Sequence, residues 1–122
     1  MTAKQAKDAG VAAARGAAAE AAAAQMLAAR GLRVIERNFR VKGGEIDLVC
    51  RDGDTTVFVE VRLRTRQDYG GAAASITATK QARLILAARH WLARKGETPC
   101  RFDAVLSDGK SLEWIRDAFQ AN

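Results

Sequence analysis

Residues 44–62 have the sequence GEIDLVCRDGDTTVFVEVR, which carries the clearest structural signal in the chain. Glu45–Arg51 and Thr55–Arg64 are rich in apolar and β-branched residues and are predicted to be strands. The residues between them, Asp52-Gly53-Asp54, are typical of a tight hairpin turn. The two strands are therefore expected to pair as antiparallel neighbours, and the rest of the chain is interpreted around them.

Regular elements are predicted on both sides of this hairpin. Thr77 can cap a helix that extends to about Lys95 and stops at Gly96. Together with a helix at the N-terminus, the elements follow the order αβββαββ, which is typical of a mixed α/β domain. The other strands are predicted at Leu32–Phe39, Cys100–Leu106 and Leu112–Arg116.

Alanine dominates the N-terminal part of the chain. Residues 3–29 contain fifteen Ala, which is the strongest helix former. Because two early glycines weaken the segment, residues 1–10 are predicted to be a flexible Ala-rich tail. A firm helix is expected to follow and to end at Arg30, with Gly31 as its C-cap. Residues 11–122 are therefore predicted to form a single domain.

The composition favours one compact domain with a polyanionic partner. The chain has 122 residues, of which 48% are hydrophobic and 28% charged, and its formal net charge is +6. This length is typical of one domain, and the hydrophobic fraction excludes a wholly disordered or fibrous protein. Of the 20 cationic residues 14 are Arg, the side chain better suited to bidentate phosphate contacts. A GC-rich genome would explain the same excess of Arg and Ala.

Several function classes are excluded by the motifs that the sequence lacks. Cys50 and Cys100 are far apart and have no CxxC spacing, so no zinc site or disulfide framework is predicted, and both are expected to act as small apolar residues. No run of apolar residues is long enough to span a membrane and no signal peptide is recognised, which predicts a cytoplasmic protein. Glycine motifs for nucleotides are missing, so no organic cofactor is expected. The single His excludes a catalytic triad.

Acidic side chains in the two hairpin strands are the main candidates for chemistry. Because side chains alternate between the faces of a strand, Glu45 and Asp47 are expected on one face. Ile46 and Leu48 are expected together on the other face. The antiparallel pairing should bring Asp47 close to Glu60 on the neighbouring strand.

Two neighbouring carboxylates repel each other, which raises a pKa unless a cation lies between them. Such oxygen ligands are also what Mg²⁺ prefers. The alternative is a structural ion-pair network of Asp47 and Glu60 with Arg62, which shares a face with Glu60. Glu20 can join the carboxylates because the alanines around it let its helix approach the sheet closely. The alternative for Glu20 is a solvated position on the helix.

The helix after Thr77 carries a basic stripe. At 100° per residue, an arc of about 80° contains its main cationic side chains. The adjoining arc is apolar and is expected to face the sheet. A nucleic-acid backbone could lie along the stripe, although an ordinary solvated helix face would look the same. The basic arc consists of Lys80, Arg83, His90 and Arg94, and the apolar arc of Leu84, Ala88, Trp91 and Leu92.

A second basic segment follows the third predicted strand. Arg64 and Arg66 precede Tyr69 and the pair Gly70-Gly71. The glycines predict a flexible loop. Its arginines could contact phosphate and its tyrosine could stack on a base, although one aromatic side chain is thin support.

The order of several short motifs resembles that of a known family. The motifs are Gly16-x-x-x-Glu20-x-x-Ala23, Asn38-Phe39-Arg40, Gly44–Val49, Phe58–Arg62, Gly70, Thr77-x-x-Lys80-Gln81, Arg101-Phe102-Asp103 and Asp117-Ala118-Phe119. From Gly16 to the C-terminus, the ordered set resembles the YraN-like family of small bacterial proteins, which is described as uncharacterised and endonuclease-like. That family is placed in the restriction-endonuclease-like superfamily, whose site has the pattern PD-(D/E)xK.

The resemblance implies a fold and a set of site residues. It implies a restriction-endonuclease-like αβββαβ core, with a mixed sheet flanked by helices. Asp47 matches the first carboxylate of the superfamily site, Glu60 the second, and Arg62 the position of the lysine. Glu20 matches a glutamate in the first helix that related Holliday-junction resolvases use at the metal. Arg62 departs from the pattern, because arginine stays protonated and cannot act as a general base, although it can hold a phosphate.

These observations lead to the hypothesis of a metal-dependent nuclease that hydrolyses phosphodiester bonds in DNA, with branched DNA as one candidate substrate. Asp47 and Glu60 would hold Mg²⁺, or Mn²⁺ in its place, with Glu20 assisting, and Arg62 would steady the scissile phosphate. A nucleic-acid-binding or interaction module without catalysis is the alternative, and a scaffold without a metal is a third. Leu86 lies off the apolar arc and leaves a homodimer contact open.

Overall fold

The computed structural model describes residues 3–64 and 76–121, with side chains from residue 16 onward. The elements in chain order are α1 (Ala3–Ala29), β1 (Arg33–Val41), β2 (Gly44–Asp52), β3 (Thr55–Leu63), α2 (Ala78–Lys95), β4 (Cys100–Ser107) and β5 (Leu112–Phe119). The order αβββαββ that the sequence predicts is therefore confirmed. The predicted loop with Arg66 and Tyr69 lies outside the described residues.

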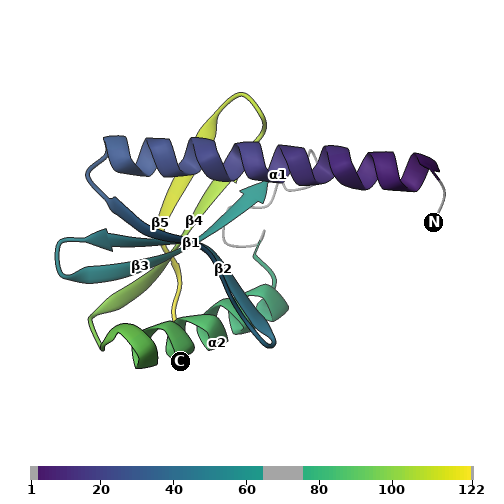
Figure 1. Cartoon of the computed structure of the whole chain (residues 1–122). Helices are drawn as coiled ribbons and strands as arrows, with labels where there is room; N and C mark the ends of the chain where they lie inside the picture. The colour runs from purple at the N-terminus through teal and green to yellow at the C-terminus, as the bar shows by residue number, and fades with distance from the viewer. Residues whose placement is uncertain (1–2, 65–75, 122) are drawn as a thin grey trace.

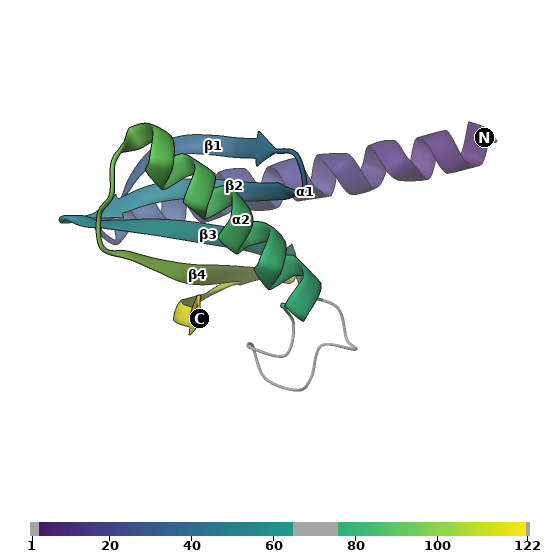
Figure 2. The ribbon, with the colours of Figure 1, turned by 90° about the horizontal axis from the view of Figure 1, so that it is seen from below.

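A mixed five-stranded sheet lies between the two helices of the described chain (Figure 1). Its strand order is β1-β2-β3-β4-β5, and only β3 and β4 in this sheet are parallel. A parallel pair needs a crossover connection, and α2 lies in that connection. Figure 2 shows α2 crossing the strands on one face of the sheet, while α1 lies on the other. The fold is therefore an α/β fold with a mixed sheet flanked by helices, as expected.

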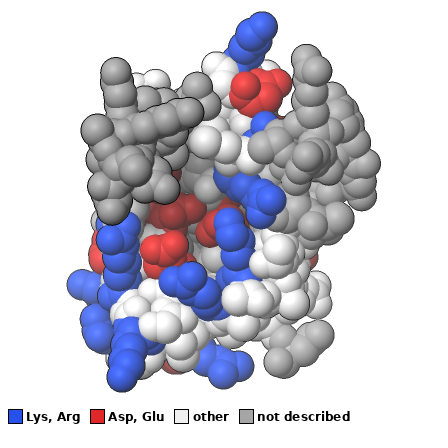
Figure 3. Space-filling model, turned by 90° about the vertical axis from the view of Figure 1, so that its right-hand side faces the viewer, with Lys and Arg blue, Asp and Glu red and all other residues white. Residues whose placement is uncertain are grey.

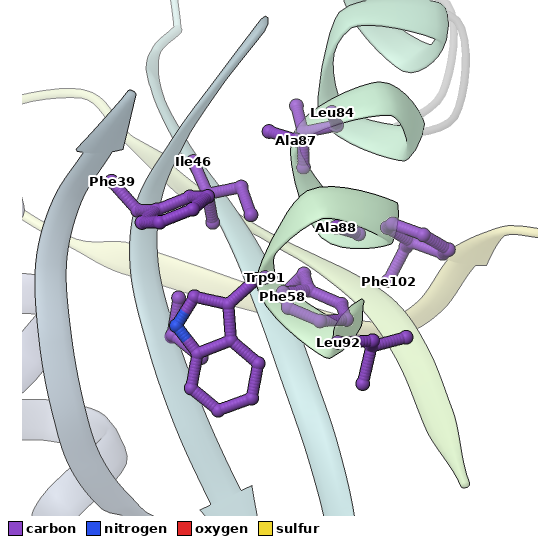
Figure 4. Packing of buried hydrophobic residues seen from close by; sticks show 10 residues of the cluster. Phe39, Ile46, Phe58, Leu84, Ala87, Ala88, Trp91, Leu92 and Phe102 are labelled. Atoms are coloured by element: carbon purple, nitrogen blue, oxygen red, sulfur yellow. The ribbon is translucent and has the colours of Figure 1, made fainter. Parts of the chain in front are cut away.

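Aromatic and aliphatic side chains fill the space between α2 and the sheet (Figure 4). Trp91 packs edge-on against Phe58, with ring centroids 5.9 Å apart and an interplanar angle of 78°. Phe58 also lies 5.6 Å from Phe102 on β4, measured between ring centroids. Leu84 and Ala88 complete the contact from the helix. The predicted apolar arc thus faces the sheet, and its packing holds the exposed side of α2 at a fixed place beside the strands.

Small side chains let α1 lie close to the opposite face. Ala23, Ala24 and Leu27 are almost completely buried against that face. Figures 1 and 2 both show that the N-terminal part of α1 extends beyond the sheet. The half of the helix over the sheet is therefore the half that positions Glu20.

The ends of the helices follow partly from capping residues. The hydroxyl of Thr77 accepts a hydrogen bond from the backbone N–H of Lys80 at 3.2 Å, and α2 ends at Lys95 with Gly96 as its C-cap, both as predicted. Helix α1 begins at Ala3 rather than near residue 11. Once a helix is nucleated, each further alanine adds to it at little cost, and two glycines are too few to stop it. The flexibility of residues 1–10 stays a prediction.

The structure can be compared with the predictions for the two cysteines and for membrane-spanning segments. Cys50 is completely buried, as expected, whereas Cys100 is exposed. The prediction for Cys100 was wrong because this residue begins β4 directly after Pro99, at the margin of the sheet. In the part of the chain that the structure describes, no helix is long and apolar enough to cross a membrane.

Candidate active site

The hairpin strands separate at one end, and Asp47 lies where they part. The β2–β3 ladder starts beside the turn and ends at the pair Leu48–Val59. Beyond this pair, the backbone N–H of Val61 donates a hydrogen bond to Oδ2 of Asp47 at 2.8 Å. A side-chain oxygen therefore satisfies a donor that a longer ladder would have paired with a backbone carbonyl. The carboxylate of Asp47 is held in the opening between the strands.

An irregularity in β1 and β2 accompanies this opening. Ile46 packs in the cluster under α2, whereas Leu48 packs in the cluster under α1. The prediction that these two side chains share a face was therefore wrong. On β1, Asn38 has a φ of 53°, and the β1–β2 pairing skips Asn38 and Asp47. Asn tolerates this left-handed conformation better than most residues, and the simple alternation of side chains along β2 is interrupted at Asp47.

Glu60 meets Asp47 across the opening. Its exposed fraction is only 8%, and a hydrogen bond with Asp47 is one of the effects that lower its pKa. Two carboxyl groups can form such a bond only when one of them carries a proton. Burial, followed by the charge of Glu60, raises the pKa of Asp47 to about 7, against the opposing hydrogen bond from Val61. Burial also raises the pKa of Glu60, and the charge of Lys80 opposes that rise. The pair therefore keeps a proton up to a higher pH than isolated carboxyl groups do.

Positive side chains border the carboxylate pair. Nζ of Lys80, on the first turn of α2, lies 3.7 Å from Oε1 of Glu60, and the charge of Arg62 also lowers the pKa of Glu60. Figure 3 shows acidic side chains near the middle of this end of the molecule, with Lys and Arg around them. A hollow of about 40 Å³ beside the pair is lined by Glu45, Glu60, Lys80, Arg83 and Leu84.

Glu20 contributes to this site from α1 through its charge, which raises the pKa of Asp47. Among residues 16–64 and 76–121, no three Asp, Glu, His or Cys side chains are grouped closely enough to hold a metal ion. The structure thus brings Asp47 and Glu60 together, with Glu20 near enough for its charge to act on Asp47. The pair nevertheless fits a divalent cation, because its oxygen atoms are preferred ligands of Mg²⁺. A cation would also allow both carboxyl groups to ionise in a buried place.

The predicted nucleic-acid-binding residues do not all lie together. Arg83 borders the hollow, and Arg94, about three turns further along α2, lies with its guanidinium carbon 5.5 Å from the ring centroid of Phe39. Arg64 forms an ion pair of 2.9 Å with Glu113 on β5 and lines a different cavity of about 780 Å³ beside α1. Arg64 directly follows β3, and its side chain extends toward β5. Arg64 is therefore separate from the stripe on α2.

Asp103 is a buried acid for which the sequence predicted no role, although it belongs to one of the short motifs. Asp103 on β4 is completely buried and accepts hydrogen bonds from Arg101 Nε at 3.1 Å and Trp114 Nε1 at 3.0 Å. It also accepts one from the backbone N–H of Asp117 at 2.9 Å. These contacts join β4 to β5 where their register shifts. A carboxylate amid apolar strand residues was the available signal, the same one that pointed to Glu60.

The fold and the site together define an α/β domain in which a buried and a half-buried carboxylate lie together where two strands of a mixed sheet part. The chain belongs to the family described as Uncharacterised protein family UPF0102, whose model matches residues 19–106. The matched range runs from Ala19 in α1 to Leu106 in β4 and so contains both carboxylates and the whole of α2. The family expected from the motifs is confirmed.

Relatives from several bacteria match most of the chain. A UPF0102 protein of Dechloromonas aromatica is 61% identical over 109 residues, which cover 89% of this chain and 91% of the relative. A UPF0102 protein of Methylobacillus flagellatus is 55% identical over 106 residues, covering 84% and 94%. The UPF0102 protein YraN of Salmonella arizonae is 51% identical over 123 residues, covering 98% and 87%.

Proposed function

We propose that this protein is a metal-dependent nuclease of the restriction-endonuclease-like type that hydrolyses phosphodiester bonds in DNA. The observation that carries the proposal is the placement of two acids where β2 and β3 part, with Asp47 held by the backbone N–H of Val61 and Glu60 buried beside Lys80. Burial of two carboxyl groups in contact weakens folding unless a positive group compensates. Proteins retain such arrangements mainly where chemistry or ion binding requires them.

Each group around the pair has a role in this proposal. Asp47 and Glu60 would hold Mg²⁺ or Mn²⁺, which when bound supplies a Lewis acid and an activated water. Val61 donates to Oδ2 of Asp47 and so fixes that carboxylate at the opening between β2 and β3. Arg62 steadies the scissile phosphate through its permanent charge. Glu20 adds negative charge near Asp47, which strengthens attraction for a cation.

The basic side chains of α2 would hold the DNA backbone. Arg83 is exposed and borders the hollow beside Glu60. Arg94 is exposed further along the same helix and lies over Phe39 of β1. A phosphate backbone that follows α2 from Arg94 to Arg83 would reach the carboxylate pair. Such contacts position DNA without reading its sequence.

Arg62 favours a second candidate, a DNA-binding module without turnover. It occupies the place where the superfamily pattern has a lysine, and it cannot accept a proton from water. The second candidate keeps the basic helix and the carboxylate pair but has no hydrolytic step. The two candidates therefore differ only in cleavage.

Cleavage assays separate the two candidates. Duplex, single-stranded and four-way-junction DNA would each be incubated with the protein and either Mg²⁺, Mn²⁺ or EDTA. We expect cleavage with a metal and its loss in Asp47→Asn and Glu60→Gln, with DNA affinity in EDTA retained. Asp54→Asn, an exposed acid in the β2–β3 turn, is the matched control and should cleave normally.

Two results would contradict the nuclease proposal. If Asp47→Asn and Glu60→Gln both still cleave DNA, the cleavage does not come from this carboxylate pair. DNA binding without cleavage of any substrate, by wild type and by Arg62→Lys alike, would establish the binding module instead.

A further inference from the structure

Lys80 lies in the first turn of α2, whose backbone is fixed by hydrogen bonds. Its backbone N–H donates to the capping hydroxyl of Thr77. The next residue, Gln81, donates from Nε2 to the backbone carbonyl of Ile76 at 3.0 Å, and Ile76 is itself 3% exposed. These two hydrogen bonds tie the first turn of α2 to the residues that precede it. The backbone of Lys80 is therefore held at a fixed place beside the sheet.

The ammonium of Lys80 lies where a cation is needed. Nζ is 3.7 Å from Oε1 of Glu60, and the side chains of Lys80 and Glu60 are 44% and 10% exposed. One partner is therefore buried while the other is open to solvent. A long, flexible side chain can leave such a pair without breaking the packing around it.

We propose that Lys80 occupies the cation position at Glu60 in the free protein and moves to the DNA phosphate when a divalent metal takes that position. The inference rests on the proposed function and deepens it, because it couples metal binding to DNA binding. An ammonium and a divalent metal cannot both lie close to the same carboxylate without repulsion. The metal therefore displaces Lys80 from Glu60.

The displaced ammonium has a nearby place to go. Lys80 and Arg83 line the same hollow beside Glu60, and they lie three residues apart on one face of α2. A phosphate entering beside Arg83 meets Lys80 once its ammonium has left Glu60. Metal and DNA then strengthen each other's binding, since coupling between two sites is reciprocal.

The metal side of the exchange is tested by calorimetric titration with Mn²⁺ in the absence of DNA. Lys80→Gln removes the competing charge, and we expect it to bind Mn²⁺ about three- to tenfold more tightly than wild type. Lys80→Arg keeps the charge and should stay within about twofold of wild type. Lys95→Gln removes an equal charge from the last turn of the same helix and should also leave the affinity unchanged.

The DNA side is tested by fluorescence anisotropy with a phosphorothioate-protected duplex, which resists hydrolysis. In EDTA, Lys80→Gln should bind this duplex within about twofold of wild type, because the ammonium of the wild type is engaged with Glu60. In Mg²⁺, wild type should gain about fivefold more affinity than Lys80→Gln. Thermal unfolding of each variant verifies that it is folded.

The outcomes distinguish this inference from the proposed nuclease. Metal binding by wild type with no tightening in Lys80→Gln would overturn the exchange and leave the nuclease proposal standing. Equal gains in DNA affinity for wild type and Lys80→Gln on adding Mg²⁺ would also overturn it. If neither wild type nor Lys80→Gln binds Mn²⁺, both proposals fall.

Discussion

Replacing Asp47 by Asn should stabilise the protein while it removes a carboxylate of the candidate site. The amide oxygen of Asn can still accept the hydrogen bond from Val61, and its amide nitrogen can donate to Glu60. The geometry around the opening is therefore retained. What disappears is the negative charge that burial opposes.

The size of the effect follows from the pKa of Asp47, which is raised from 3.8 to about 7 in the folded protein. Below pH 3.8 the group is protonated in the folded and unfolded states, so it costs nothing. As the pH rises toward 7, the unfolded chain loses this proton while the folded protein keeps it, and the free energy of unfolding decreases. Each tenfold difference in proton affinity corresponds to about 1.4 kcal/mol, which gives a full penalty of about 4 kcal/mol above pH 7.

The gain in Asp47→Asn should be somewhat smaller than that penalty, because Asp47 shares its proton with Glu60. We expect the variant to exceed wild type by about 2–4 kcal/mol at pH 8 and by much less at pH 4. Urea unfolding of both proteins in EDTA, at several pH values between 4 and 8, measures this difference. Asp54→Asn in the neighbouring turn should show no comparable gain. Equal stability of wild type and Asp47→Asn at pH 8, or the same gain at pH 4 and pH 8, would refute the reasoning.

Three further variants test the packing and the DNA-binding surface. Gly44→Ala would place its Cβ 2.6 Å from the backbone oxygen of Arg83, so α2 must shift and the free energy of unfolding should fall by about 1–3 kcal/mol. Urea unfolding measures this loss, and an unchanged free energy would mean that α2 is loosely held. Asp103→Ala removes the acceptor of the hydrogen bonds from Arg101 Nε and Trp114 Nε1 and should lower the free energy of unfolding by about 3–5 kcal/mol. A decrease below about 1 kcal/mol in the same assay would contradict the role of Asp103 in joining β4 and β5. Arg83→Glu should weaken DNA binding and make it less dependent on salt concentration in anisotropy titrations; the same salt dependence as wild type would count against α2 as the DNA-binding helix.

Local sequence was sufficient for the secondary structure because the relevant interactions are local. The turn at Gly53 and the cap at Thr77 involve residues only a few positions apart, and both lie where they were predicted. The start of α1 was misplaced, since helix propagation depends on the neighbouring turns and not on single glycines. Family membership could also be predicted from the order of short motifs.

The neighbourhood of Asp47 and Glu60 was predictable, because a hairpin necessarily brings its two strands together. The hydrogen bond between them, and the one that the backbone N–H of Val61 donates to Asp47, could not be predicted. Both lie where the β1–β2 pairing skips Asn38 and Asp47, and a strict alternation of side chains gives no indication of this irregularity. That is why Ile46 and Leu48 were assigned to one face.

The chain's sequence alone was enough to establish the elements, their order and the acids that deserved attention, because periodicity, capping and turn residues act over short distances. Only the tertiary structure decided which charges meet. Lys80 reaches Glu60 from a different element, whereas Arg64, close to Glu60 in sequence, pairs with Glu113. The physical reason is that ion pairs depend on distance in space, and this distance is set by the packing of α2 on the sheet and by the pairing of β5 with β4.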